Sequence, residues 1–261
     1  MSESIRNLFT EISPTYDRLN HLLSFNIDKR WRRKTIEEIR NRKTPLKALD
    51  LCAGTLDLSR EFLRQFPTSN VQAVDFSQGM LDQGMKKLSP EEREKIQTIC
   101  ADALSLPFPD GTFDVVFCGY GFRNLDNQET ALHEIRRVLK PGGQLLILEF
   151  FKPTNWFTKL FHSTYGHFML PTVGGLISRQ SHAYRYLHES ISRFYTLNEC
   201  KIMFNNHMFK SLNHKNFFNG VSSLISAIKD SEGSLGGGGG GPPRRARMST
   251  VGETADRPQR A

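Results

Sequence analysis

The sequence predicts an α/β fold built on a mostly parallel sheet, and three observations indicate it. Short apolar runs alternate with helical segments between residues 46 and 149, which is typical of strand–helix–strand units with parallel strands. Residues 46–57 run as a strand, a turn of small residues and a helix start. In an open α/β sheet such a turn faces a nucleotide-like ligand. The 261 residues are enough for one such domain with a sizeable core.

Residues 1–43 are predicted to form a helical cover at the N-terminus. Apolar residues recur at steps of three and four from Phe9 to Leu23, and Pro14 divides this stretch into two short helices. The basic run K-R-W-R-R-K at 29–34 starts a further helix that reaches about Arg42. This run is either a solvated helix face or a contact for lipid headgroups or another ligand.

The remainder of residues 1–230 is expected to hold seven strands with helices on both faces of the sheet, and a helical insertion before the last two strands. Ser89 and Glu92 have the spacing of a capping box, and K-P-G-G at 140–143 is expected to be a tight turn before the fifth strand. The expected strands are 46–51, 70–74, 96–100, 113–118, 144–149, 208–213 and 217–227, and the expected helices include 56–65, 78–88, 127–139, 155–170, 181–194 and 196–206.

Residues 231–261 have a different composition from the rest of the chain. Six consecutive glycines, Gly236 to Gly241, precede the basic stretch R-R-A-R. Such a segment buries too little apolar surface to offset the entropy of ordering it. We therefore expect a disordered Gly/Arg-rich tail at 231–261, and its few arginines are only a weak indication of nucleic-acid binding, so no nucleic-acid partner is predicted.

The composition indicates a protein of the cytoplasm. The net charge of +8 includes +3 from residues 233–261, so the folded part is mildly basic, which suits an anionic membrane surface, an acidic ligand or an ordinary solvated surface. The four cysteines form no C-x-x-C pair and are expected to be buried free thiols, and the eight histidines form no metal-ligand pattern. No run approaches the roughly 18 apolar residues of a membrane span, so any membrane contact is expected to be peripheral.

The candidate cofactor residues lie in and after the turn of residues 46–57. Asp50 lies near the end of the strand, and Gly54 and Thr55 lie in the turn itself. Asp75 ends the second strand, 21 positions after Gly54, where a carboxylate can accept hydrogen bonds from a ribose diol. The alternative is a helix-capping site, since Ser77 precedes the helix that starts at residue 78.

Two further motifs follow the third and fourth strands. The Asp102 carboxylate is placed to reach an adenine amino group, with Ala103 leaving room for the ring; the alternative is an N-cap of a turn before Pro107. The stretch G-Y-G-F-R-N at 119–124 follows the fourth strand. Because the carboxyl ends of parallel strands meet at one edge of the sheet, these motifs are expected near the turn of residues 46–57.

At this point a family resemblance is evident. The stretches D-L-C-A-G-T-L-D, V-D-F-S-Q-G-M-L, A-D-A-L-S-L-P-F-P-D-G-T-F-D and R-V-L-K-P-G-G-Q-L resemble the class I, S-adenosylmethionine-dependent methyltransferases. Three further stretches resemble signatures of the ubiquinone/menaquinone biosynthesis C-methyltransferases. They are Y-D-R-L-N-H-L-L-S-F-N-I-D-K-R-W at 16–31, G-F-R-N with L-E-F, and S-H-A-Y-R-Y-L-H-E-S at 181–190. The resemblance runs from about Phe9 to Lys229.

The resemblance implies a Rossmann-like fold, S-adenosylmethionine as cofactor and transfer of its methyl group to a ring carbon of a prenylated quinol. The nearest acceptor is demethylmenaquinol; alternatives are a 2-methoxy-6-polyprenyl-benzoquinol or another small molecule, tRNA or protein. A cofactor-binding module without activity is a further alternative, and a homodimer is compatible with the sequence. Residues 151–195 are expected to form a lid over the substrate, with an aromatic entrance for the prenyl tail.

Residue roles carry over by position. The family's cofactor contacts fall on Thr55, Asp75, Asp102 and Ala103, its quinol-facing pair on Arg123 and Asn124, and its flanking substrate motifs on Tyr16, Tyr184 and Tyr186. The chain departs from the family pattern at Cys52 and Leu56, which replace glycines of the general loop, and at Leu19, Asp28 and Gly119. Leu56 is expected to lie beside the cofactor and to alter its binding.

The chemistry requires a carbon nucleophile held in line with the sulfonium. Loss of the phenolic proton gives the ortho carbon enolate character, and positioning and oxyanion stabilisation should supply most of the acceleration. Arg123 remains protonated, so it is expected to orient or stabilise the phenolate, while Asn124 fixes the ring. The general base is open among Asp102, His182, His188 and solvent.

Overall fold

The computed structural model describes residues 3–13, 24, 26–164 and 181–230. The described residues within Met1–Ser231 form one compact unit. The second N-terminal helix, Tyr16, part of the lid region and the predicted disordered tail lie outside the described residues. Within the described part, no helix is long and apolar enough to cross a membrane.

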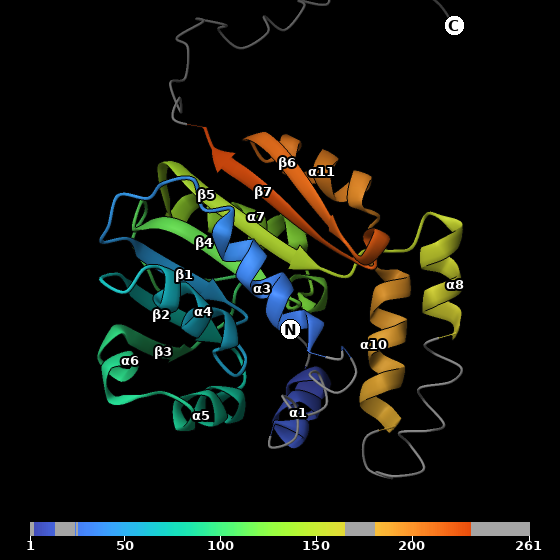
Figure 1. Cartoon of the computed structure of the whole chain (residues 1–261), viewed down its shortest axis with the longest axis horizontal. Helices are drawn as coiled ribbons and strands as arrows, with labels where there is room; N and C mark the ends of the chain where they lie inside the picture. Colours follow the sequence, from blue (N-terminus) through green and yellow to red (C-terminus); the bar gives the residue numbers. More distant parts are fainter. Residues whose placement is uncertain (1–2, 14–23, 25, 165–180, 231–261) are drawn as a thin grey trace, which may run out of the picture. The chain divides into compact units, whose positions relative to one another are not determined.

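A seven-stranded, mostly parallel sheet forms the centre of the fold, as predicted (Figure 1). Its strand order is β3-β2-β1-β4-β5-β7-β6. The first five strands of the chain pair in parallel, whereas β7 runs antiparallel to both β5 and β6. The strands are β1 (Lys47–Leu51), β2 (Asn70–Asp75), β3 (Ile96–Cys100), β4 (Phe113–Gly119), β5 (Leu139–Glu149), β6 (Phe209–Phe217) and β7 (Ser222–Lys229).

The strand order reverses between β1 and β4. From β1 the chain continues to β2 and β3 on one side, and β4 and β5 lie on the other. In such sheets ligands bind outside the carboxyl ends of the strands at this switch point. The turn after β1 and the G-Y-G-F-R-N motif after β4 therefore meet there.

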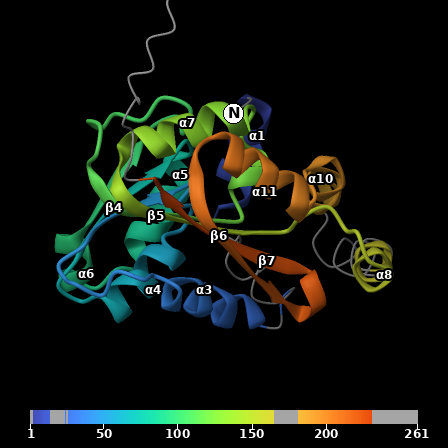
Figure 2. The ribbon, with the colours of Figure 1, turned by 90° about the horizontal axis from the view of Figure 1, so that it is seen from above.

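Helices cover both faces of the sheet, as predicted (Figure 2). Successive residues of β5 face opposite ways: Leu145 and Ile147 join the cluster under α7 and α11, and Leu146 and Leu148 join the cluster under α3 and α4. Burial on both faces explains the continuous apolar run of this strand. The helices are α1 (Glu3–Ile12), α3 (Ile27–Glu37), α4 (Asp57–Gln65), α5 (Gln78–Lys86), α6 (Pro90–Lys95), α7 (Gln128–Val138), α8 (Trp156–Thr164), α10 (Ser181–Arg193) and α11 (Leu197–Asn206), with 3-10 turns η1 (Phe122–Asn124) and η3 (Phe218–Gly220).

The predicted helix cap is confirmed, whereas the predicted turn at 140–143 is wrong. The capping box at Ser89 and Glu92 is present at the start of α6. By contrast, K-P-G-G does not precede the fifth strand but lies inside β5, at a register shift against β4, with Gly142 at φ 74°. Strand pairing with Phe113 starts at Leu139 and so extends the strand across the expected turn.

The basic run at 29–34 is solvated only in part: Lys29, Arg30 and Arg33 are exposed, whereas Trp31 and Arg32 are not. Trp31 is only 9% exposed and stacks on Phe217 at 6.1 Å between ring centroids. Arg32 pairs with the buried Asp28, which also accepts a hydrogen bond of 2.6 Å from Ser24 Oγ. Asp28, one of the departures from the family pattern, thus fixes the start of α3. All four cysteines are free as expected, although Cys100 is exposed.

Candidate active site

The turn after β1 adopts a backbone that normally requires glycine. Cys52, Gly54 and Leu56 have φ angles of 55°, 53° and 66°. These are the three glycine positions of the general methyltransferase loop, and the chain keeps the left-handed conformation although two of them carry side chains. Such a conformation costs an L-residue roughly 1–2 kcal/mol. The Ala53 amide donates to Val74 O at 3.0 Å and fixes the loop against β2.

The expectation that Leu56 lies beside the cofactor is wrong. Its side chain is fully buried in the core and faces Gly84 of α5. A Cβ atom added at Gly84 would lie 2.5 Å from Leu56 Cγ. The leucine therefore fills the space that Gly84 leaves open, so its size is accommodated within the helix packing.

Asp50 supports the loop from the core side. It is 1% exposed and accepts a hydrogen bond of 2.6 Å from Ser59 Oγ of α4. Burial raises the pKa of this carboxyl to about 7. The carboxyl joins β1 to the helix that follows the turn, and its predicted cofactor contact stays a prediction.

Asp75 links the two loops of the predicted cofactor site. Its Oδ2 accepts from the Gly54 amide at 2.8 Å and its Oδ1 from the Ser77 amide at 2.9 Å. Burial raises the pKa of this carboxyl to about 6. Helix capping belongs to Ser77, whose hydroxyl accepts from the Met80 amide. Asp75 thus lies between the first turn and the start of α5, and its ribose contact stays a prediction.

The remaining predicted cofactor residues lie at the carboxyl ends of β1 and β3. Thr55 is buried within the turn. Asp102 is exposed, and its Oδ1 accepts from the Leu104 amide at 3.0 Å, so the turn-forming alternative is realised. Ala103 is 6% exposed and joins the core beside Leu106.

The N-terminal helix α1 contacts the same end of β2. Thr10 Oγ1 lies 2.9 Å from Ser77 Oγ, and Arg6 Nε donates to Phe76 O at 3.2 Å. A Cβ added at Gly79 would lie 3.1 Å from Thr10 Cγ2. Helix α1 therefore packs against the loop that Asp75 begins.

Arg123 forms a buried ion pair with Glu149, the last residue of β5. Arg123 Nη1 donates to Glu149 Oε1 at 2.6 Å, and the Arg123 amide donates to Glu149 Oε2 at 3.1 Å. The side chains are 6% and 0% exposed. Arg123 Nε also donates to Ser190 Oγ of α10 at 3.2 Å. The sequence reasoning did not assign a role to Glu149; the available signal was an acid at the end of an apolar strand.

Asn124 and Tyr186 connect η1 to α10. The Tyr186 hydroxyl donates to Asn124 Oδ1 at 2.9 Å, and the Tyr186 ring contacts Phe9 edge-on at 6.1 Å between centroids. Burial raises the pKa of Tyr186. The structure thus brings Arg123, Asn124 and Tyr186 together, whereas the side chains of Tyr184 and His182 lie outside the described residues.

Tyr120 is a further residue that the sequence reasoning missed. It has φ 62° between two glycines at the end of β4. Its ring stacks on Phe150 at 4.6 Å, and its hydroxyl lies 3.2 Å from Ser222 Oγ. Its carbonyl accepts from Arg123 Nη1 at 2.6 Å. Tyr120 therefore helps to hold the guanidinium.

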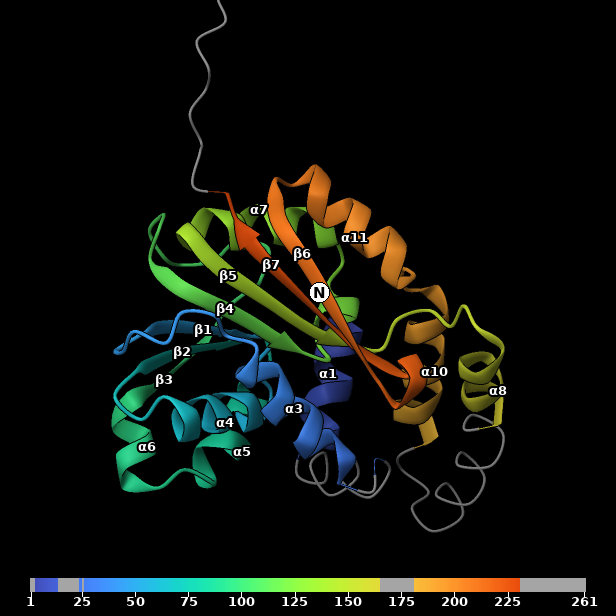
Figure 3. The ribbon, with the colours of Figure 1, turned by 45° about the horizontal axis from the view of Figure 1, so that its top comes forward.

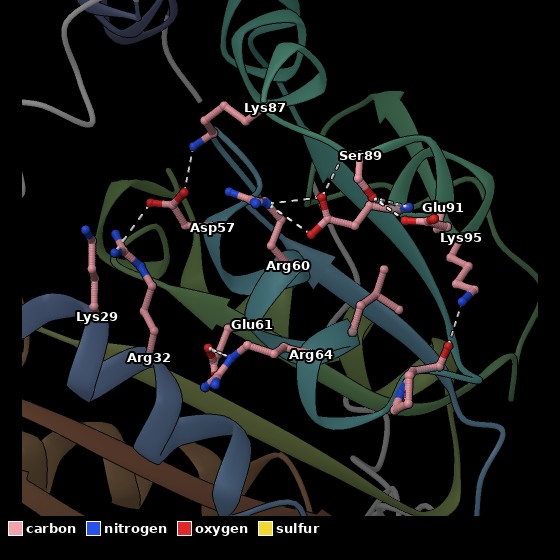
Figure 4. Close-up of a pocket in the computed structure, with 13 residues that line it drawn as sticks. Lys29, Arg32, Asp57, Arg60, Glu61, Arg64, Lys87, Ser89, Glu91 and Lys95 are labelled. Atoms are coloured by element: carbon pink, nitrogen blue, oxygen red, sulfur yellow. Dashed lines mark hydrogen bonds and ion pairs between the residues drawn. The ribbon is translucent and has the colours of Figure 1, made fainter.

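A separate groove of about 630 Å³ runs along α4 (Figure 4). Its charges largely pair with one another, as in Arg60–Glu92 at 3.1 Å and Lys87–Asp57 at 2.6 Å. It contains none of the predicted cofactor or quinol residues. The candidate active site is therefore the switch point at the strand ends and not this groove.

The polar groups at the switch point fit S-adenosylmethionine. Asp75 ends β2 and Asp102 follows the neighbouring strand β3, and such acceptors suit a ribose diol and an adenine amino group. The turn supplies backbone at a helix N-terminus, which suits a carboxylate.

Comparisons with known proteins agree with this arrangement. The ubiE/COQ5 methyltransferase family model matches residues 1–229. A demethylmenaquinone methyltransferase of Thermus thermophilus is 44% identical over 187 residues, 72% of this chain and 84% of that protein. The ubiquinone/menaquinone biosynthesis C-methyltransferase UbiE of Geobacter sulfurreducens is 38% identical over 229 residues, 87% of this chain and 89% of that protein.

Solved structures show the same fold at low identity. A S-adenosylmethionine-dependent methyltransferase of Thermotoga maritima superposes with a TM-score of 0.61 at 14% identity, covering 86% of this chain and 99% of that chain. A chain from a complex of the Haloferax volcanii Trm112 methyltransferase activator gives a TM-score of 0.64 at 14% identity, with 85% and 97% covered. These likenesses show a class I methyltransferase fold. The family match over residues 1–229, together with the relatives at 44% and 38% identity, establishes that the chain belongs to the ubiE/COQ5 methyltransferase family.

Proposed function

We propose that this protein transfers the methyl group of S-adenosylmethionine to a ring carbon of a prenylated quinol, and that the acceptor is demethylmenaquinol. The observation that carries the proposal is the 44% identity to a protein named for this activity, over 72% of this chain. The benzoquinol acceptor is the second candidate, because the name of the Geobacter relative covers both quinone pathways.

The chain's own residues would act by holding the ring and stabilising its oxyanion. S-adenosylmethionine supplies a methyl group that is already activated on a sulfonium. Glu149 holds the Arg123 guanidinium at 2.6 Å and offsets its charge before the substrate enters. When the phenolic proton leaves, the guanidinium would stabilise the oxyanion, an interaction that is strong where water is excluded.

Asn124 would fix the ring orientation, because its Oδ1 is held by Tyr186 at 2.9 Å. Asp75 and the turn at Gly54 would hold the cofactor. The proton acceptor stays open among Asp102, His182, His188 and solvent. A general base contributes about 10²–10⁴-fold, so separate alanine variants distinguish these candidates.

The direct test is methyl transfer by the purified protein. Short-chain demethylmenaquinol and the corresponding benzoquinol, both kept reduced, are incubated with S-adenosylmethionine, and the products are analysed by mass spectrometry and NMR. C-methylation of the naphthoquinol, at a higher kcat/KM than the benzoquinol, supports the proposal. A product methylated on oxygen, or no product although calorimetry shows cofactor binding, rejects it.

We also propose a cytoplasmic location, a peripheral membrane contact and a homodimer. We further propose that the chain divides into a domain at 1–230 and a tail. Sedimentation equilibrium tests the dimer. Limited proteolysis tests the boundary near residue 230, since a tail without a core should be cut first.

A further inference from the structure

Three large apolar side chains on α8 and η3 are exposed. Trp156 is 75% exposed, Leu160 54% and Phe218 52%; we call these three the aromatic patch. Trp156 and Leu160 lie one turn apart on the same stripe of α8. On the next stripe, Phe157 and Phe161 contact the Phe218 ring at 5.8 and 5.7 Å between centroids. The patch is therefore continuous, unlike single exposed residues, which need no explanation.

The exposure of Trp156 is unusual for this residue type. Tryptophan is highly buried on average, and the other tryptophan of the chain, Trp31, is only 9% exposed. Trp31 stacks on Phe217 within the core. Trp156 has one described ring contact, with Phe157 at 6.0 Å, and most of its indole faces outward.

The segment that carries most of the aromatic patch has basic but no acidic residues, since the sequence contains no aspartate or glutamate between Glu149 and Glu189. Lys159 is exposed next to Leu160 on α8, and Lys152 is exposed four residues before Trp156, where it also interacts with Glu199 of α11. An indole with apolar neighbours and nearby lysines suits the boundary between headgroups and acyl chains of a bilayer. Lysines near such a surface are attracted by anionic lipids.

The aromatic patch lies one helix away from the predicted quinol residues. Helix α8 packs beside α10 (Figure 3), where the rings of His162 and His188 are 4.3 Å apart. Helix α10 carries Tyr186, which donates to Asn124 at 2.9 Å. A surface that contacts α8 is therefore close to the helix whose Tyr186 and Ser190 contact Asn124 and Arg123.

We propose that the aromatic patch, together with Lys152 and Lys159, docks this protein on the surface of a bilayer that contains anionic phospholipids. The inference rests on the proposed function, since a prenylated quinol resides in a bilayer. Docking through α8 holds α10 near the lipid surface, so that the quinol ring can reach the site while its tail remains among the acyl chains.

The experiment uses Trp156 as its own reporter. In the full-length Trp31→Phe variant, Trp156 is the only tryptophan. Vesicles of phosphatidylcholine mixed with phosphatidylglycerol are added, and a second set carries bromine on the acyl chains. We expect a blue shift of the Trp156 emission and quenching by the brominated lipid. No shift and no quenching would overturn the proposal, as would a shift that depends on protein concentration without vesicles, which indicates a second copy on the patch.

Variants separate the apolar and the charged contributions in sedimentation with the same vesicles. Replacing Trp156, Leu160 and Phe218 together by alanine should lower the partition coefficient at least about tenfold, given the apolar area removed. Ile202→Ala, a matched control on α11 with Ile202 59% exposed, should leave it unchanged; an equal loss in the control overturns the proposal.

Replacing Lys152 and Lys159 by glutamine should lower binding to the anionic vesicles by about fivefold per lysine, with no effect on vesicles of phosphatidylcholine alone. Equal losses on both vesicle types contradict the charged part of the proposal. Methyl transfer to a short-chain quinol in detergent is measured in parallel. Turnover without vesicle binding rejects the docking surface alone, and vesicle binding without turnover rejects the proposed function alone.

Discussion

The buried ion pair of Arg123 and Glu149 can be tested by replacing Glu149 with glutamine. The carboxylate is fully buried and the guanidinium is 6% exposed. Without the carboxylate, water therefore cannot solvate the unpaired positive charge of Arg123. Removing one partner of a buried pair typically costs about 3–5 kcal/mol. Because glutamine keeps an oxygen that accepts from Arg123, we expect the lower end, about 3 kcal/mol. That is a large share of the roughly 5–15 kcal/mol that stabilises a typical domain.

The assay is urea denaturation followed by circular dichroism. Glu189→Gln is the matched control, since its pair with Arg193 at 3.2 Å is exposed and should contribute below about 0.5 kcal/mol. Adding Arg123→Gln to Glu149→Gln should recover part of the loss, because no uncompensated buried charge remains. A loss for Glu149→Gln that equals the loss for the control would refute the reasoning.

Three further predictions concern the cofactor side. Gly84→Ala should lower the free energy of unfolding by about 1–3 kcal/mol, because its Cβ would lie 2.5 Å from Leu56 Cγ; thermal melting measures it, and an unchanged melting temperature contradicts the packing. Burial raises the pKa of Asp50 from 3.8 to about 7, so the folded state keeps a proton that the unfolded state loses. This contribution to the free energy of unfolding is complete below about pH 3.8 and is lost as the pH rises to about 7. Asp50→Asn should therefore weaken the pH dependence of the free energy of unfolding, measured by urea denaturation, in that window. An unchanged pH dependence speaks against the raised pKa. Asp75→Asn should weaken S-adenosylmethionine binding about tenfold or more in calorimetry, with the exposed Asp82→Asn as control; equal affinities of both variants would exclude the ribose contact.

The fold could be predicted because its signals are local. Alternating apolar runs specify strands and amphipathic helices, and the capping box at Ser89 and Glu92 is written in four consecutive residues. The spacing of Gly54 and Asp75 likewise led to a loop pair that the structure joins by a hydrogen bond of 2.8 Å. In each case the interacting groups lie close together in the sequence or within one strand–helix–strand unit, so their spacing can be read directly from the chain.

The parts that could not be predicted depend on register between distant segments. Residues 140–143 have the composition of a turn, yet pairing of Leu139 with Phe113 draws them into β5. Leu56 was expected beside the cofactor because its position along the loop is known from sequence, whereas the direction of its side chain depends on where α5 places Gly84. No local pattern reports that packing.

The amino-acid sequence therefore determines the α/β class, the family, and the residues of the turn at 46–57 and of the G-Y-G-F-R-N motif at 119–124. Each of these depends only on composition and on spacing along the chain. The ion pair of Arg123 with Glu149 and the contact of Asn124 with Tyr186 exist only once β4, β5 and α10 come together. Their partners lie 26 and 62 residues apart. Side-chain contacts over such separations are selected by the packing of the whole sheet, which is why the chemistry of the site emerges only in the folded protein.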